Sequence, residues 1–253
     1  MRTLATAVRT GEAVVGSWIS IGHPAVAEMS AELGFDFVVI DAEHTSMSLE
    51  TVETLARAVD AASGETEPLV RVADDDPARL KRVLDTGVSG VIVPMVETEA
   101  QARGIADATR YPPEGVRGVA GSRASRYGRE LADYFERAND ERLVVTQIES
   151  ELGVENAAEI AAVDGIDALF LGPADLSASL GRFDDTESLD TEISAVLDAG
   201  RDANVPVGSI ALASEDVERW VDAGFDFQVV GVDADYLLDG ASRAKRTYKE
   251  AIR

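Results

Sequence analysis

The sequence predicts a (β/α)8 barrel, a closed ring of parallel strands surrounded by helices. Three observations favour this fold class: eight short apolar segments typical of buried strands, helix-like segments between them, and an internal repeat. The length of 253 residues is also the usual size of one such barrel. The candidate strands are Val15–Ser20, Phe37–Asp41, Pro68–Val72, Gly90–Pro94, Val144–Glu149, Ala168–Gly172, Pro206–Ile210 and Phe227–Val232.

Helix-like segments alternate with these strands, as parallel βαβ units require. Examples are Pro24–Leu33, Leu49–Ala62, Pro77–Leu84 and Ser214–Ala223. A doubly wound open sheet would show the same alternation. The sequence lacks, however, the G-x-G-x-x-G turn after the first strand that marks nucleotide-binding sheets of that kind. The barrel is therefore the favoured architecture.

The internal repeat joins the end of a helix to the following strand. Residues 31–41 read AELGFDFVVID and residues 221–231 read VDAGFDFQVVG, with looser copies at 84–94 and 163–172. Each copy has glycine where the helix would end, because the residue after a helix favours a left-handed backbone that glycine adopts at little cost. A repeated helix–glycine–strand unit is what a barrel of identical units should leave in its sequence.

The whole chain, residues 1–253, is predicted to be one barrel domain with two additions. A long insertion at about 97–143 holds a helix over Glu99–Thr109, a glycine- and arginine-rich loop, and a second helix over Arg129–Ala138. Connections of this length are usually functional or disordered, and we interpret this one as a lid or a subunit contact. The last segment, Tyr236–Arg253, should form a helix that closes the barrel or packs on a neighbouring subunit.

Composition excludes several classes of function. The formal net charge of −24 opposes binding to nucleic acid, and no apolar run is long enough to cross a membrane. The absence of cysteine excludes disulfides and thiolate chemistry. The N-terminal residues lack the apolar region of a signal peptide, so a cytoplasmic protein is expected.

The charge is also unusual in kind, because only three of the 23 basic residues are lysine. A large acidic excess with few lysines suggests adaptation to high salt, where screening suppresses self-repulsion. An acidic protein from a genome rich in G and C is the alternative, since such genomes favour arginine over lysine. We favour salt adaptation. Full stability and activity in dilute buffer would contradict it.

Polar side chains gather where the candidate strands end, which is where barrels of this kind carry their chemistry. They are Asp41, Glu43 and His44 after the second strand, Arg71 on the third, Gln147 and Glu149 on the fifth, and Asp175 after the sixth. Two carboxylates such as Glu149 and Asp175, with water and substrate oxygens, suit Mg²⁺ or Mn²⁺. In so acidic a chain the alternative is a pair of solvated or salt-bridged acids.

His44 and Arg71 are the candidates for proton transfer and charge stabilisation. His44 has Asp41 three residues earlier, and a neighbouring carboxylate can orient an imidazole and raise its basicity. Arg71 lies within an apolar strand, where a buried cation needs an anion, such as a substrate carboxylate or an enolate oxygen. A surface histidine and an arginine merely salt-bridged to Glu149 or Asp41 are the alternatives. No lysine ends a candidate strand, so a Schiff-base mechanism is not expected.

The chain resembles the class II pyruvate aldolases typified by 4-hydroxy-2-oxoheptanedioate aldolase and 2-dehydro-3-deoxyglucarate aldolase. The shared motifs are Asp-x-Glu-His at 41–44, Tyr-Pro-Pro-x-Gly-x-Arg-Gly at 111–118, Gln-x-Glu at 147–149 and Gly-Pro-x-Asp-Leu-Ser at 172–177. The resemblance extends through nearly the whole chain and implies a barrel of the phosphoenolpyruvate/pyruvate-binding type. Ala42 and Tyr127 depart from it, standing where relatives often have Gly and Trp.

The resemblance also implies roles for individual residues. Glu149 and Asp175 would bind Mg²⁺ or Mn²⁺, with Co²⁺ as a third candidate. Gln147, Gly172 and the backbone around Ala174 would position the carboxylate of pyruvate. Arg71 would stabilise the enolate, and His44 would act as general acid–base with Asp41 and Asp85 as its associated acids. Asp85 precedes a strand and would therefore lie at the opposite rim, so it could act only in a neighbouring subunit of a trimer or hexamer.

The implied reaction is the reversible cleavage of 4-hydroxy-2-oxo acids to pyruvate and an aldehyde. Two other functions remain open from sequence. A lyase acting on citryl- or malyl-CoA esters would use similar acids, although the chain shows no obvious basic patch for CoA. A barrel that binds a metal or a 2-oxo acid without catalysis is the other alternative.

Overall fold

A computed structural model describes residues 3–183 and 186–252. Eight parallel strands form a closed barrel in sequence order, which confirms the predicted fold class. Two strands, β2 and β8, have the predicted boundaries, and the other six begin or end within two residues of them. The strands are β1 (Val14–Ile19), β2 (Phe37–Asp41), β3 (Glu67–Arg71), β4 (Gly90–Val93), β5 (Leu143–Ile148), β6 (Ala168–Leu171), β7 (Val207–Ile210) and β8 (Phe227–Val232).

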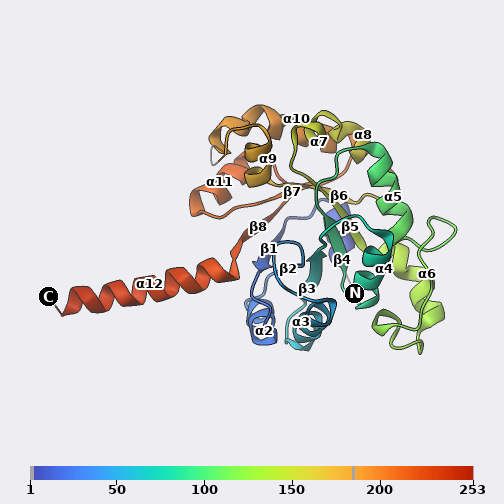
Figure 1. The fold of residues 1–253 in the computed structure, drawn as a ribbon, viewed down its shortest axis with the longest axis horizontal. Coiled ribbons are helices and arrows are strands. Elements are labelled where there is room, and N and C mark those ends of the chain that lie inside the picture. Colours follow the sequence, from blue (N-terminus) through green and yellow to red (C-terminus); the bar gives the residue numbers. More distant parts are fainter. Residues whose placement is uncertain (1–2, 184–185, 253) are drawn as a thin grey trace.

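Helices surround the barrel as the alternation predicts (Figure 1). Several begin at a side-chain cap, such as Ser48 before α3 and Thr98 before α5, which satisfies a backbone N–H that the helix leaves free. The α-helices are α1 (Leu4–Arg9), α2 (Pro24–Glu32), α3 (Leu49–Ala61), α4 (Pro77–Asp85), α5 (Glu99–Thr109), α6 (Leu131–Glu141), α7 (Glu151–Glu155), α8 (Ala157–Ala161), α9 (Pro173–Ser179), α10 (Asp190–Ala203), α11 (Ser214–Ala223) and α12 (Asp233–Ala251).

At the N-terminal end of the strands, the barrel interior is filled with aromatic and aliphatic side chains. Phe37 and Phe227 meet edge to face there, and glycine makes room for each ring. A Cβ atom at Gly16 or Gly208 would lie 2.3 Å from the ring of Phe37 or Phe227, respectively. Helix α1, which the sequence analysis did not identify, adds buried side chains to this same cluster. One end of the barrel is thus packed shut, and polar side chains are left to the other end.

The long insertion lies against the end of α4 rather than over the C-terminal ends of the strands. Arg117 is buried, donates to Asp85 at 2.9 Å and stacks on Tyr111, while Arg123 donates to the carbonyl of Thr86. Asp85 and Thr86 lie in the short connection from the end of α4 to β4, so these contacts are at the N-terminal end of the strands. The interpretation of this segment as a lid over the mouth is therefore wrong for a single chain. Its role as a subunit contact stays a prediction.

The second helix of the insertion, α6, begins two residues later than predicted and continues to Glu141.

Helix α12 projects away from the barrel instead of packing on it (Figure 1). Its start is fixed by Asp233, whose carboxylate accepts hydrogen bonds from Ser20 and from the backbone N–H of Ile21. Beyond that point, residues 235–252 are exposed apart from the half-buried Gly240. The prediction that this helix closes its own barrel is wrong.

No helix among the described residues is long and apolar enough to span a membrane.

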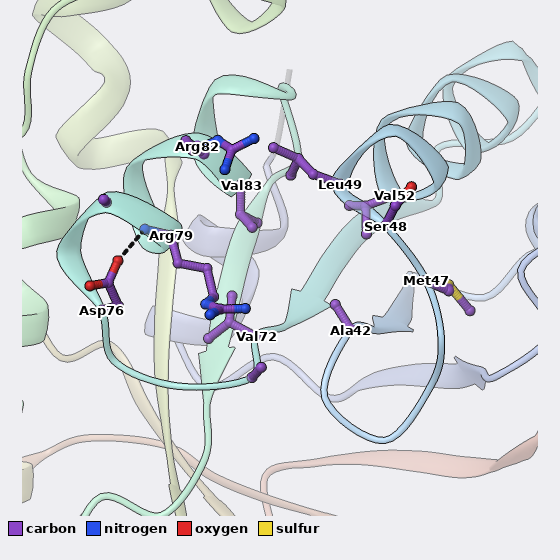
Figure 2. Close-up of a pocket in the computed structure, with 12 residues that line it drawn as sticks. Ala42, Met47, Ser48, Leu49, Val52, Val72, Asp76, Arg79, Arg82 and Val83 are labelled. Atoms are coloured by element: carbon purple, nitrogen blue, oxygen red, sulfur yellow. Dashed lines mark hydrogen bonds between the residues drawn. The ribbon is translucent and has the colours of Figure 1, made fainter.

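A cavity of about 410 Å³ lies outside the barrel wall, between the first turns of α3 and α4 (Figure 2). Its lining is mixed, with apolar side chains such as Met47 and Val83 and charged ones such as Asp76, Arg79 and Arg82. Asp76 caps α4 by accepting the N–H of Arg79 at 2.9 Å. None of the ionisable residues predicted to form the site is among the described residues that line this cavity.

Candidate active site

Arg71 and Asp41 form a buried ion pair at the mouth of the barrel. The two residues are partners in the register of β2 and β3, which places both side chains on the same face of the sheet. Arg71 donates from Nε to Asp41 Oδ1 at 3.0 Å and from Nη2 to Asp41 Oδ2 at 2.8 Å. Burial by itself raises the pKa of Asp41, but the hydrogen bonds and charge of Arg71 outweigh it and leave that pKa lowered.

Two further residues fix the guanidinium of Arg71. Its Nε lies 3.2 Å from Glu43 Oε2, and its Cζ lies 4.6 Å from the ring centre of Trp18. Stacking on an indole face is favourable for a cation and also keeps the guanidinium plane in one orientation. The sequence placed Glu43 at this rim without a role, and no role was predicted for Trp18. Trp18 is in β1 and Glu43 follows β2, and both contact Arg71.

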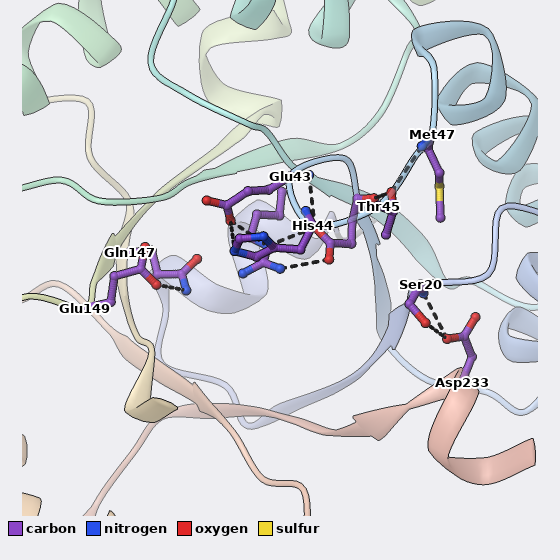
Figure 3. A network of polar contacts seen from close by, with 10 residues as sticks. Ser20, Glu43, His44, Thr45, Met47, Gln147, Glu149 and Asp233 are labelled. Carbon is purple, nitrogen blue, oxygen red and sulfur yellow. Dashed lines mark hydrogen bonds and ion pairs between the residues drawn. The ribbon is translucent and has the colours of Figure 1, made fainter. Parts of the chain in front are cut away.

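His44 lies on the loop after β2 with its side chain 66% exposed (Figure 3). Its Nε2 is 3.8 Å from Glu43 Oε2. Asp41 does not orient the imidazole as the sequence suggested: its Oδ1 accepts the backbone N–H groups of Glu43 and His44 at 3.1 and 3.3 Å. Asp41 therefore shapes the loop that carries His44, and the acid that contacts the ring is Glu43.

Glu149 follows β5 and is 3% exposed, so its carboxylate is almost fully buried. Its Oε1 accepts the backbone N–H of Met95 at 2.8 Å, and its Oε2 accepts from Gln147 Nε2 at 2.5 Å (Figure 3). Burial raises the pKa of Glu149 to about 7. The negative charges of Asp175 and Glu43 add to this shift, and the Met95 hydrogen bond opposes it.

Asp175 lies in the first turn of α9, directly after the Gly172–Pro173 turn that ends β6. A Cβ atom at Gly172 would lie 2.8 Å from Glu149 Oε2 and 2.9 Å from Gln147 Nε2, so glycine is required for β5 and β6 to approach here. Ala174 is exposed beside Asp175 at the start of the helix. The charge of Asp175 raises the pKa of both Glu149 and Glu43, so the three acids share one region.

This region has the chemistry of a cation site. Glu149, Glu43 and Asp175 repel one another, and Arg71 is already occupied by Asp41. The buried Oε1 of Gln147 has no hydrogen-bond partner in residues 3–183 and 186–252. No described group of three or more His, Cys, Asp or Glu side chains is arranged to hold a metal, so Glu149 and Asp175 would need water or substrate oxygens to complete a coordination shell.

Asp85 is not part of this arrangement within one chain. It is the last residue of α4 and is paired with Arg117 at the opposite end of the barrel. The other predicted site residues all lie at the ends of β2, β3, β5 and β6 or on the segments that follow them. They are Asp41, His44, Arg71, Gln147, Glu149, Gly172, Ala174 and Asp175. The structure thus brings the predicted set to one mouth and leaves Asp85 out.

The raised pKa of Glu149 has a measurable consequence for stability. The pKa of Glu149 is 4.5 in the unfolded chain and about 7 in the fold. Its contribution to the stability of the fold is therefore fully present below pH 4.5 and is lost as pH rises through about 7. Without metal, we expect the difference in unfolding free energy between the wild type and Glu149→Gln to change by up to about 3 kcal/mol between pH 4.5 and 8. Urea denaturation across this range, with chelator present, measures it. Parallel pH profiles of the two proteins would contradict the assignment.

Comparison with known proteins places the chain in a family. A profile of the family described as HpcH/HpaI aldolase/citrate lyase matches residues 15–239. The chain is 39% identical to a 4-hydroxy-2-oxovalerate aldolase of Novosphingobium aromaticivorans, over 97% of this chain and 94% of that protein. It is 38% identical to a hydroxypyruvate/pyruvate aldolase of Deinococcus radiodurans, over 99% and 91%.

Solved structures agree with the sequence comparison. A crystal structure of an HpcH/HpaI aldolase/citrate lyase family protein from Burkholderia cenocepacia superposes with a TM-score of 0.94 at 36% identity, covering 98% of this chain and all of that one. This chain belongs to the HpcH/HpaI aldolase/citrate lyase family.

Proposed function

We propose that this protein is a metal-dependent aldolase that reversibly cleaves 4-hydroxy-2-oxo acids to pyruvate and an aldehyde. The observation that carries the proposal is the buried Glu149 beside Asp175, in the same mouth as Arg71. Relatives named as 4-hydroxy-2-oxovalerate and hydroxypyruvate/pyruvate aldolases, at 39% and 38% identity, support it.

Glu149 and Asp175 would hold a divalent ion, with Mg²⁺ and Mn²⁺ as the first candidates and Co²⁺ as the third. Such an ion supplies Lewis-acid polarisation of the 2-oxo acid, which lowers the energy of the enolate. Gln147 and the backbone N–H of Ala174 would bind the substrate carboxylate. Gly172 would keep the space beside Glu149 open, because a Cβ atom at that position would lie 2.8 Å from Glu149 Oε2.

Arg71 and His44 would carry the remaining steps. Asp41 and Trp18 hold the guanidinium of Arg71 in one orientation, and its positive charge would stabilise the enolate oxygen. His44 is exposed at the same rim and would take the proton from the 4-hydroxyl group and return it in the synthetic direction. Asp85 of a neighbouring subunit would assist His44, and Asp85→Asn is the variant that tests this role.

Pyruvate release from 4-hydroxy-2-oxo acids is the test of the function. We expect release to stop in chelator and to return with Mg²⁺, Mn²⁺ or Co²⁺, and a panel of aldehydes with pyruvate should identify the synthetic partner. Activity on CoA esters alone would favour the citryl- or malyl-CoA lyase. Binding of pyruvate without exchange of its methyl protons into D₂O would indicate a barrel that does not catalyse.

We also propose that the protein is adapted to high salt and that it is cytoplasmic. The net charge of −24 with three lysines supports the first proposal. Because salt screens repulsion between exposed acids, the thermal midpoint should rise steadily between dilute buffer and molar KCl. Differential scanning fluorimetry over that range measures it, and a midpoint independent of KCl would contradict salt adaptation.

We further propose that the protein is a homo-oligomer in which α12 of one chain packs on the barrel of another. In a closed barrel, the helix after β8 normally covers β8 and β1, but α12 points away from them (Figure 1). Val15, which is on the outer face of β1, is consequently 37% exposed. Leu237, Tyr248 and Ile252 are each at least 63% exposed and recur at spacings that share one side of α12. A second copy of the chain offers the missing partner for both surfaces.

Substitution on α12 should therefore change the assembly state. We expect Leu237→Asp to reduce the molecular mass in solution, because an acid on the apolar side would be buried without a partner. Ser242→Asp is the matched control, since it adds the same charge about 140° around the helix. Light scattering after size-exclusion chromatography measures the mass. The same mass for Leu237→Asp and the wild type would contradict the role of α12.

A further inference from the structure

Met95 has a backbone conformation that its residue type does not favour. Its φ is 52°, in the left-handed region, and it shares that region with only Arg126, Tyr127 and Asn204 among the described non-glycine residues. Left-handed backbone is costly for a residue with a Cβ atom, so a position that keeps it is usually held there by its surroundings. Met95 is the second residue of the connection from β4 to α5, at the same barrel end as Glu149.

The left-handed turn has a clear geometric effect on two consecutive N–H groups. Met95 N–H donates to Glu149 Oε1 at 2.8 Å, and Val96 N–H donates to the carbonyl of Gln147 at 3.2 Å. In an extended strand, successive N–H groups point to opposite sides, so only one of the two could face β5. A left-handed residue at this point turns both toward β5, in the manner of a bulge or a backbone nest.

The turn is braced from α5 by one side chain. Gln101 Oε1 accepts the N–H of Glu97 at 3.0 Å, and Gln101 Nε2 donates to the carbonyl of Met95 at 3.3 Å. The side chain of Met95 itself is 46% exposed. The surroundings therefore fix the backbone of residue 95, while its side chain is only partly packed.

We propose that Met95 is a positioning residue for the metal ligand Glu149, acting through its left-handed backbone rather than through its side chain. Its N–H holds Oε1 while Gln147 holds Oε2, so both oxygens of the buried carboxylate are fixed before a cation arrives. This inference rests on the proposed metal-dependent function. It adds that the dihedral preference of residue 95 sets the affinity for the ion.

The test is a series at position 95 chosen by backbone preference. Glycine and asparagine adopt left-handed backbone readily, valine does not, and proline cannot and also lacks the N–H. We expect Met95→Gly and Met95→Asn to bind Mn²⁺ within about threefold of the wild type. Met95→Val should bind at least tenfold more weakly, and Met95→Pro more weakly still. The electron paramagnetic resonance signal of free Mn²⁺ gives these affinities without any activity assay.

Two controls separate the possible outcomes. Asn204→Val places the same strain at φ 56°, at the end of α10, and should lower the thermal midpoint without changing Mn²⁺ affinity. Glu149→Gln should lose Mn²⁺ binding. If it does not, the proposed metal site is wrong, whatever the position-95 series shows.

Three results would overturn the inference about Met95 while leaving the metal site intact. The first is Met95→Val binding Mn²⁺ like the wild type. The second is an inverted order, with Met95→Gly and Met95→Asn the weakest, which would show that the side chain matters. The third is an unchanged Mn²⁺ affinity in Gln101→Met, which removes the two hydrogen bonds that hold the turn. This variant also provides the test if Met95→Val does not fold.

Discussion

Replacing Glu149 by glutamine should abolish metal-dependent pyruvate release, with kcat/KM falling at least about 10³-fold. Glutamine keeps the volume of the side chain and can still accept the N–H of Met95, which donates to Oε1 at 2.8 Å. It removes the negative charge that a divalent ion needs, in a place where only 3% of the residue is exposed to solvent. The loss should therefore come from the ion and not from the fold.

The control for this variant is Glu151→Gln, an exposed acid in the first turn of α7 two residues away. Its kcat/KM should stay within about twofold of the wild type, because a solvated charge contributes little at this distance. Activity is measured over a titration of Mn²⁺ from chelated to millimolar concentration. A Glu149→Gln enzyme with an unchanged Mn²⁺ response would remove Glu149 from the metal site.

Arg71→Lys should give the second-largest loss, a fall in kcat/KM of about 10²- to 10³-fold. Lysine keeps the positive charge but cannot make the two parallel bonds to Asp41, at 3.0 and 2.8 Å, and cannot stack flat on Trp18. Asp41 and Glu43 would then draw the ammonium toward themselves and away from the mouth. The fold should also lose about 1–3 kcal/mol, because a buried carboxylate keeps fewer hydrogen bonds.

Arg142→Lys separates the catalytic loss from the loss of stability. Arg142 is also mostly buried, donates to the carbonyl of Val88 at 3.0 Å and lies 5.5 Å from the ring centre of Tyr134, but it is at the other end of the barrel. This control should lower the unfolding free energy without a comparable fall in kcat/KM. Equal kinetic losses in the two variants would mean that Arg71 acts only through stability.

The barrel could be predicted from sequence because its signals are local and repeated. The run Phe37–Asp41 has a strand's length, full apolar character up to Asp41 and a glycine three residues before it, and the observed strand has the same limits. Helix α1 could not be identified in this way, because its six residues are too few to show a period. The pattern also could not show that α12 leaves the barrel, since an amphipathic helix requires a partner without specifying which one.

The residues of the site could be named from sequence, but their pairings depend on register. Asp41 precedes His44 by three residues, which suggested an acid–imidazole contact, yet Asp41 is the register partner of Arg71 and binds it instead. Glu43, on the loop two residues after Asp41, contacts both Arg71 and His44. The conformation of Met95 left no sequence signal, because methionine is not a residue that favours positive φ.

The central claim is that Glu149 and Asp175 share one divalent ion at the mouth of the barrel. Anomalous diffraction from crystals grown with Mn²⁺ and pyruvate tests it most directly. We expect one anomalous peak at the ends of β5 and β6, within about 2.0–2.4 Å of a carboxylate oxygen from each residue. A peak elsewhere, or bound pyruvate with no peak between these two side chains, would contradict it.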